Sequence, residues 1–181
     1  MNKYKVLIRQ EFIQGKFKIL PIRFKDRIKI MEWRNEQMYH LRQFKKLTIE
    51  DQNNYFKNII KSLFSEDYPL QILFSYLEDG ICIGYGGLVH IDWNLKTAEI
   101  SFVMDSSLEE DKFEFHWKSY LSLIEQVAFG DLNFKSIFTY AYDLRPRLYT
   151  VLEDSGFIKN KVLKNNNDFD VIIHSKNNTN V

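Results

Sequence analysis

The sequence predicts a single domain of the α/β class, and three observations lead to that class. The chain has 181 residues, which is long enough to bury one substantial core. Hydrophobic residues make up 45% of it and charged residues 27%, a composition typical of globular proteins. Segments with a hydrophobic period of two alternate with segments that have a helical period. We expect one domain over residues 1–175 and a flexible polar tail at 176–181.

The first third of the chain predicts a strand followed by two helices. Residues 16–24 read as a strand that leads into a loop, and residues 26–39 fit a first helix. Residues 47–64 predict a second helix, because Thr48 and Asp51 have the spacing of a capping box.

The middle of the chain predicts a three-stranded antiparallel meander and a long helix. Residues 70–92 contain two segments in which apolar and polar residues alternate, joined by a Glu-Asp-Gly turn. This pattern predicts a β-hairpin. Residues 97–105 alternate as a third strand, with Glu99 on the face opposite Ile100. The apolar positions of residues 112–129 fit one face of an amphipathic helix.

The last third predicts strand, helix and strand. Residues 134–143 read as a strand, residues 145–157 as a short helix that ends at Gly156, and residues 168–175 as a final strand.

Charge and cysteine content exclude several classes of function. The 25 basic and 24 acidic residues nearly balance, which argues against a nucleic-acid-binding protein. Cys82 is the single cysteine, so neither an intrachain disulfide framework nor a thiolate metal site is expected, and its apolar surroundings predict a core residue. The sequence has no signal peptide and no membrane span, so we expect a cytoplasmic protein without a membrane partner. Self-association is left open.

The order of these elements, together with the segment LYTVLEDSGF at residues 148–157, resembles the GNAT superfamily of N-acyltransferases. The resemblance covers about residues 17–175 and implies the GNAT fold, a mixed and mostly antiparallel sheet flanked by helices. It also implies acyl-CoA as the co-substrate, direct attack by an amine in a ternary complex, and no metal.

Four segments are similar to a branch of this superfamily that acylates nucleotide-linked deoxyamino sugars. They are MEWRNEQMYHLRQ, GYGGLVHIDW, TAEISFVMD and DVIIHS. The triplet WRN also occurs in ribosomal-protein N-terminal acetyltransferases, so a protein N-terminal acetyltransferase is an alternative. A non-catalytic module that binds CoA or a nucleotide is another.

The sequence departs from the superfamily in the turn that normally binds the pyrophosphate of CoA. Residues 105–117, DSSLEEDKFEFHW, lack the glycine motif, and Leu152 stands where many members have a general-acid tyrosine. We expect the cofactor to be held by backbone N–H groups of the third strand and by nearby cations. The predicted cofactor-binding residues are Phe102, Val103, Met104, Lys112, Arg145 and Arg147.

Three residues are the catalytic candidates. Glu99 could accept the ammonium proton, or be a salt-bridged edge residue. His90 would face the same cleft if the hairpin pairs in its simple register, and is otherwise structural. Tyr149, one turn before Leu152, could donate to the leaving thiolate, or pack in the core.

The acceptor side is predicted around the first helix, where Arg34 or Arg42 could contact a nucleotide diphosphate and an aromatic ring could contact a base or sugar. His116 is predicted on the surface, and the glycines of GYGGL mark a close backbone approach within a strand. Three of the acceptor candidates also have a structural interpretation. Asp92 could begin the turn before residue 94, His174 could be a buried structural histidine, and Trp33 could pack in the core. The full set of acceptor candidates is Trp33, Arg34, Asn35, Tyr39, Arg42, Asp92 and His174.

Overall fold

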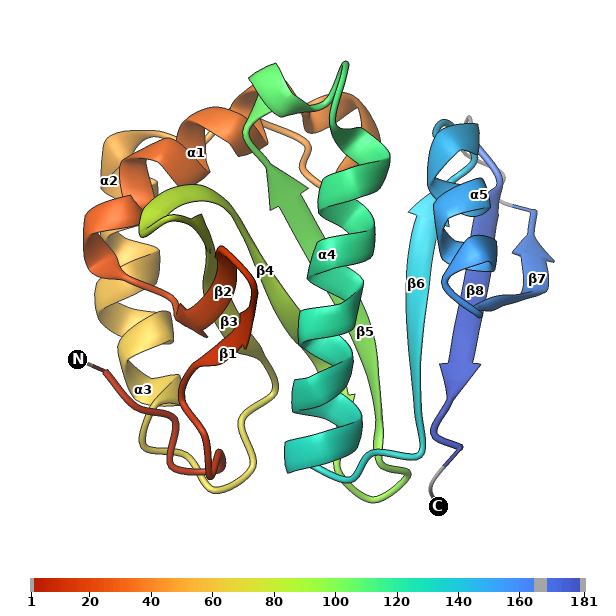
Figure 1. Cartoon of the computed structure of the whole chain (residues 1–181). Helices are drawn as coiled ribbons and strands as arrows, with labels where there is room; N and C mark the ends of the chain where they lie inside the picture. The colour runs from red at the N-terminus through yellow and green to blue at the C-terminus, as the bar shows by residue number, and fades with distance from the viewer. Residues whose placement is uncertain (1, 165–168, 180–181) are drawn as a thin grey trace.

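The protein is built on one eight-stranded sheet, seen in a computed structural model that describes residues 2–164 and 169–179 (Figure 1). The strand order is β1-β2-β3-β4-β5-β6-β8-β7, and every neighbouring pair is antiparallel except β5 and β6. The expected mixed, mostly antiparallel sheet flanked by helices is therefore confirmed. The strands are β1 Phe12–Gln14, β2 Phe17–Pro21, β3 Ile72–Glu78, β4 Ile81–Asp92, β5 Thr97–Met104, β6 Ser136–Tyr142, β7 Ile158–Leu163 and β8 Val171–Asn177.

Helices cover both faces of this sheet. The α-helices are α1 Arg27–Glu36, α2 Ile49–Tyr55, α3 Lys61–Leu63, α4 Phe113–Glu125 and α5 Pro146–Asp154. The capping box is present, since the Asp51 N–H donates to Thr48 Oγ1 at 3.1 Å. The second predicted helix is interrupted by a π-helical segment at Phe56–Ile60, and α4 continues into another at Gln126–Asp131. No helix in the described residues is both long and apolar enough to cross a membrane.

The face of β5 that carries Phe102 packs against α4. The Phe102 ring stacks on Tyr120 with centroids 3.9 Å apart, and Trp117 meets it edge-on at 5.0 Å. The predicted amphipathic helix is confirmed, but the prediction that His116 lies on the surface is wrong. His116 is fully buried and its Nδ1 lies 3.2 Å from the Tyr76 hydroxyl, because α4 also covers the β2–β3 part of the sheet.

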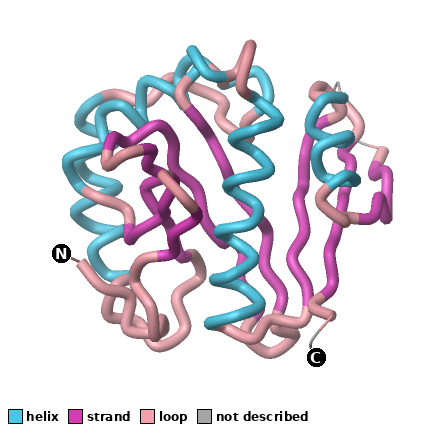
Figure 2. The backbone as a smooth tube through the Cα atoms, viewed as in Figure 1, coloured by secondary structure: helices cyan, strands magenta, loops and turns pink. Residues whose placement is uncertain are grey.

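β5 and β6 part soon after they begin to pair. Their parallel ladder has three residue pairs, from Thr97–Ser136 to Glu99–Phe138. β5 continues to Met104 and β6 to Tyr142, and Figure 2 shows them running apart beyond the last pair. The divergence opens at the carboxyl ends of two parallel strands, where open α/β sheets commonly bind ligands.

The chain ends differ from expectation. Lys176 and Asn177 belong to β8, and Asn178 is buried with its side chain donating to the Phe134 carbonyl at 3.0 Å, so a flexible tail from residue 176 is wrong for these residues. Positions 180–181 lie outside the described residues. β1 and β7 were not predicted.

The glycines of β4 are required by the spacing of the strands. Gly86 and Gly87 lie within the strand as predicted, and a Cβ on Gly87 would lie 1.9 Å from the Ile72 carbonyl oxygen of β3. The close approach is thus made by a neighbouring strand.

We expect Gly87→Ala to lower the free energy of unfolding by about 3 kcal/mol, because the new methyl group overlaps backbone that cannot move without breaking the ladder. Urea unfolding monitored by tryptophan fluorescence measures the change. Gly130→Ala is the matched control, since its Cβ meets only the tip of the Arg9 side chain, at 3.4 Å. Equal stability of the two variants would contradict this account.

Candidate active site

A cleft of about 100 Å³ lies where β5 and β6 diverge. Its walls come from both strands, from α4, from the start of α5 and from the segment after α1. The lining residues are His40, Leu41, Arg42, Glu99, Ile100, Ser101, Phe102, Trp117, Thr139, Tyr140, Ala141, Tyr142, Arg145 and Leu148.

The backbone of β5 presents polar groups to this cleft. The Asp105 N–H donates to the Ile83 carbonyl at 2.8 Å, which fixes the alternation of the β4–β5 ladder. By that alternation, the N–H groups of Phe102 and Met104 point toward the β6 side, whereas Val103 bonds toward β4. Of the three predicted backbone positions, Phe102 lines the cleft, whereas Val103 and Met104 do not.

Glu99 is a buried carboxylate at the point where the strands part. It forms an ion pair with Arg42, and His90 Nε2 lies 3.7 Å from its second oxygen. Burial raises the pKa of Glu99, while Arg42 and His90 oppose that rise. The Arg42 guanidinium also lies 4.8 Å above the Tyr140 ring, which holds it in place.

The contact between His90 and Glu99 depends on a bulge. The β4–β5 register shifts between Val89 and Asp92, and His90 has a φ of 48°. The simple register, on which the prediction for His90 depends, is not formed here. In that register His90 would pair with Ala98 and face away from Glu99. The bulge is what brings the two predicted residues together.

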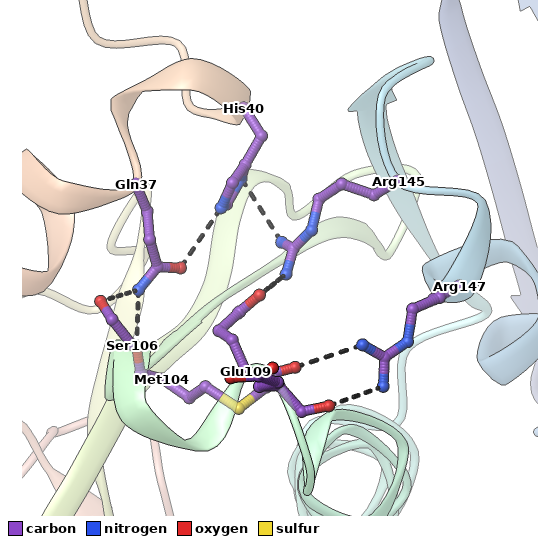
Figure 3. Close-up of polar contacts among 8 residues, drawn as sticks. Gln37, His40, Met104, Ser106, Glu109, Arg145 and Arg147 are labelled. Carbon is purple, nitrogen blue, oxygen red and sulfur yellow. Dashed lines mark hydrogen bonds and ion pairs between the residues drawn. The ribbon is translucent and has the colours of Figure 1, made fainter.

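The turn without glycine is held by two arginines at the start of α5, Arg145 at its N-cap and Arg147 in its first turn (Figure 3). Arg145, whose side chain is 9% exposed, donates to both carboxylate oxygens of Glu109 at 2.7 and 2.8 Å. Arg147 donates to the backbone carbonyls of Glu109 and Glu110 at 3.4 and 3.2 Å. Both guanidiniums lie over the Phe113 ring, at 4.9 and 5.0 Å. The cations lie at the start of α4, as predicted, and Arg145 is already occupied by an anion of the chain itself.

His40 connects this turn to α1. Its Nδ1 lies 3.4 Å from Arg145 Nη1 and its Nε2 lies 3.2 Å from Gln37 Oε1. Because arginine can only donate, Nδ1 accepts and Nε2 carries the proton. Burial and the charge of Arg145 lower the pKa of His40 to about 3. Gln37 in turn donates to the Met104 carbonyl at 2.8 Å, so the end of α1 is fastened to the end of β5 (Figure 3).

A second cavity, of about 290 Å³, lies between the α1–α2 layer and strands β3 to β5. Arg34 lines it and donates to the Tyr85 hydroxyl at 2.6 Å and to Gln43 at 2.9 Å, and no described carboxylate lies within ion-pair distance of it. Ser101 lines both this cavity and the cleft, so the two adjoin across β5. The other lining residues are Ile22, Ile30, Leu47, Asp51, Gln52, Tyr55, Phe56, Gln71, Leu73 and Val89.

Five predicted acceptor residues, His174 among them, line neither cavity. Trp33 is buried in the core, at 5% exposure, and Tyr39 is exposed on the edge of His40. Asn35 is used locally, since it donates to the Leu47 carbonyl and accepts from the Leu47 N–H. Asp92 accepts the N–H groups of residues 94 and 95, which is the turn alternative.

Tyr149 and His174 form a pair on the α5 side of the sheet. Their rings stack with centroids 5.5 Å apart, and His174 Nε2 lies 3.4 Å from Glu153. The Tyr149 hydroxyl donates to Asp143 at 3.0 Å, and burial raises its pKa to about 12. Neither residue lines the cleft. Lys112 is exposed at the start of α4.

Sequence reasoning missed Gln37 and Glu109 and gave His40 no role. Glu109 lies in a run of acidic residues and Gln37 at a helix end, and both positions resemble solvated surface in the sequence. The described residues contain no group of three or more His, Cys, Asp or Glu side chains arranged to hold a metal ion.

Comparison with known proteins identifies the class. The family of the acetyltransferase (GNAT) domain matches residues 19–173, so the chain belongs to the GNAT acetyltransferases. It is therefore an acyl-CoA-dependent N-acetyltransferase that uses acetyl-CoA, which confirms the predicted activity at this level. Buried donors without partners in the cleft, Trp117 Nε1 and Thr139 Oγ1, fit a site that holds a polar ligand.

Solved structures share this fold at low identity. Spermidine N-acetyltransferase from Vibrio cholerae in complex with CoA and spermine has a TM-score of 0.78 and 14% identity, over 92% of this chain and 98% of that one. A dodecameric structure of spermidine N-acetyltransferase from the same organism has a TM-score of 0.72 and 15% identity, over 92% and 96%. No curated protein sequence matches the chain.

We expect Glu109→Gln to tighten CoA binding about tenfold, because the phosphates no longer compete with a carboxylate for Arg145. Arg145→Gln should weaken binding by a similar factor. Calorimetric titration with CoA measures both constants. Asp154→Asn, which removes an exposed ion pair with Lys118, is the control and should leave the constant unchanged. An unchanged constant in Glu109→Gln would exclude Arg145 from the phosphate site.

Proposed function

We propose that this enzyme transfers an acyl group from acyl-CoA to the amine of a nucleotide-linked deoxyamino sugar. The observation that carries the proposal is Arg34, a half-buried cation without a carboxylate partner among the described residues, in a cavity that adjoins Glu99 through Ser101. A guanidinium in such a place suits an acceptor with a phosphate group. The four sequence segments similar to the amino-sugar branch point the same way.

In this proposal the reacting amine comes from the second cavity and meets the acyl group where β5 and β6 part. Glu99 takes the proton of the ammonium group, since an amine must be neutral to attack. Arg42 keeps the carboxylate ionised and fixed in direction. The Phe102 N–H, which points toward the β6 side where the cleft lies, donates to the developing oxyanion. The buried Cys82 has no part in the reaction, and burial raises the pKa of its thiol to about 11.

A polyamine is the alternative acceptor, because the similar structures are spermidine N-acetyltransferases. A polyamine keeps further ammonium groups, which require carboxylates around the site. Of the two carboxylates that line the cavities, Glu99 is paired with Arg42 and Asp51 belongs to the capping box. Arg145 is balanced by Glu109, whereas Arg34 has no ion-pair partner among the described residues. This balance of charge favours an acceptor that carries an anion. The dodecamer belongs to the similar protein, and self-association of this chain stays a prediction.

The acceptor is tested by thiol release from acetyl-CoA with a panel of UDP- and TDP-linked amino sugars, spermidine and an N-terminal peptide. We expect turnover with a nucleotide-linked sugar. Arg34→Gln should raise KM for that sugar at least about tenfold with a smaller effect on kcat, since the lost contact lies away from the reacting amine. Lys29→Gln, exposed on the same helix, is the control. Turnover with spermidine alone would overturn the proposal.

We expect Glu99→Gln to lower kcat by roughly 10²-fold, because the amide cannot accept a proton. In the unchanged enzyme, activity should fall as pH falls through the pKa of Glu99, which burial raises above its ordinary value, because protonation removes the base. Pre-steady-state and saturating kinetics across pH measure both effects. Glu153→Gln, another glutamate beside a histidine but outside the cleft, is the control. Unchanged turnover at saturating substrate would remove Glu99 from the role of base.

A further inference from the structure

Two buried polar groups of the cleft have no hydrogen-bond partner in the described part of the chain. They are the indole N–H of Trp117 and the hydroxyl of Thr139, and both residues are 4% exposed. The remaining buried orphans, one ring nitrogen each of His116 and His174, belong to residues that do not line the cleft. Unpaired buried donors are rare in native proteins, and two that line the same cleft point to a polar partner bound there.

Thr139 occupies a special position in the sheet. The last pair of the β5–β6 ladder is Glu99 with Phe138, so Thr139 is the first residue of β6 beyond the pairing. Side chains alternate along a strand, and Tyr140, which contacts Arg42, shares the face of Glu99. Thr139 therefore projects to the other face, one residue beyond the level of Glu99.

That other face is the α4–α5 side of the cleft. Trp117 packs against Phe102 there, and Leu148 of α5 completes the wall. Phe102 and Leu148 make much of this face apolar, and buried His174 of β8 is the register partner of Thr139. A hydrogen bond made there by a ligand is largely protected from water.

The expected thiolate donor is missing from this side. Leu152 stands at the position of the superfamily tyrosine and is fully buried, and the Tyr149 hydroxyl is already bonded to Asp143. Tyr140 and Tyr142 line the cleft, but strand alternation places them on the face of Glu99. On the opposite face, where Thr139 lies, neither Leu152 nor Tyr149 supplies a free hydroxyl for the leaving thiolate.

We propose that Thr139 and Trp117 are the hydrogen-bond donors for the acyl-thioester arm, with the Thr139 hydroxyl serving the sulfur and the Trp117 N–H serving an amide carbonyl of the arm. The amine proton passes to Glu99 on one face of the sheet, the new C–N bond forms, and the C–S bond breaks with its electron pair on sulfur. The Thr139 hydroxyl stays protonated and stabilises the thiolate through its hydrogen bond, and water protonates the thiolate after release. This inference rests on the acyl transfer of the family and is independent of the acceptor.

The test measures the thiol of bound CoA and needs no acceptor. The pKa of that thiol is followed by its thiolate absorbance in the ultraviolet during a pH titration of the CoA complex. Thr139→Val, which keeps the shape and removes the hydroxyl, should raise this pKa by about one unit. Thr139→Ser should restore it, and Thr150→Val, exposed on α5, should leave it unchanged.

Thermal unfolding gives a second readout, with opposite sign for a structural role. Removing a hydroxyl that the folded protein leaves unbonded should raise the Tm of Thr139→Val by about 2–4 °C without ligand. A hydroxyl that stabilises the fold would give a lower Tm and an unchanged thiol pKa, and that result would overturn the role of Thr139. Trp117→Phe should weaken CoA binding about fivefold by calorimetry, and an unchanged Kd would overturn the role of Trp117.

Discussion

The early divergence of β5 and β6 is the constraint on which the site depends. After three residue pairs the backbone groups of the two strands no longer form hydrogen bonds with each other. The β6-facing backbone groups of β5 beyond Glu99 are therefore available to a molecule bound in the cleft. At the point of divergence, Glu99 and Thr139 lie on opposite faces of the sheet, with Thr139 one residue beyond the level of Glu99. Glu99 can therefore serve the attacking amine from one face while Thr139 serves the leaving sulfur from the other. Neither side chain has to cross the sheet.

Around that opening the charges are arranged in opposed pairs. Arg42 compensates Glu99 on the acceptor side, and Glu109 compensates Arg145 on the cofactor side. Between them, Gln37 and His40 tie the end of α1 to the end of β5 and to α5. A neutral His40 suits this position, because a protonated ring would place a second positive charge 3.4 Å from the Arg145 guanidinium. The acceptor layer and the cofactor layer are thus mechanically joined, although the helices that build them lie far apart in sequence.

The sequence predicted those parts that periodicity and local turns determine. The meander, α4 and the Thr48 capping box were recognised, since each repeats a pattern over many residues or a fixed short spacing. β1 has only three residues and carries too short a pattern. His116 escaped because α4 is buried over more of its circumference than one apolar stripe implies. His90 reaches Glu99 through a bulge, and Arg42 pairs with a residue 57 positions away, which no local pattern encodes.

The internal anion at the start of α4 has a consequence for how such enzymes are recognised. Glycine at this turn lets a phosphate reach the backbone N–H groups. A search for the glycine motif would therefore take a chain without these glycines to lack the phosphate site. Here a glutamate fills the same place and two arginines from a later helix keep the positive charge there. In such chains the positive charge at the cofactor site comes from the side chains of a later segment and not from the N–H groups of a glycine loop. The charge is kept, but the glycine motif is lost. A sequence search that considers this turn together with the first residues of α5 would find such chains.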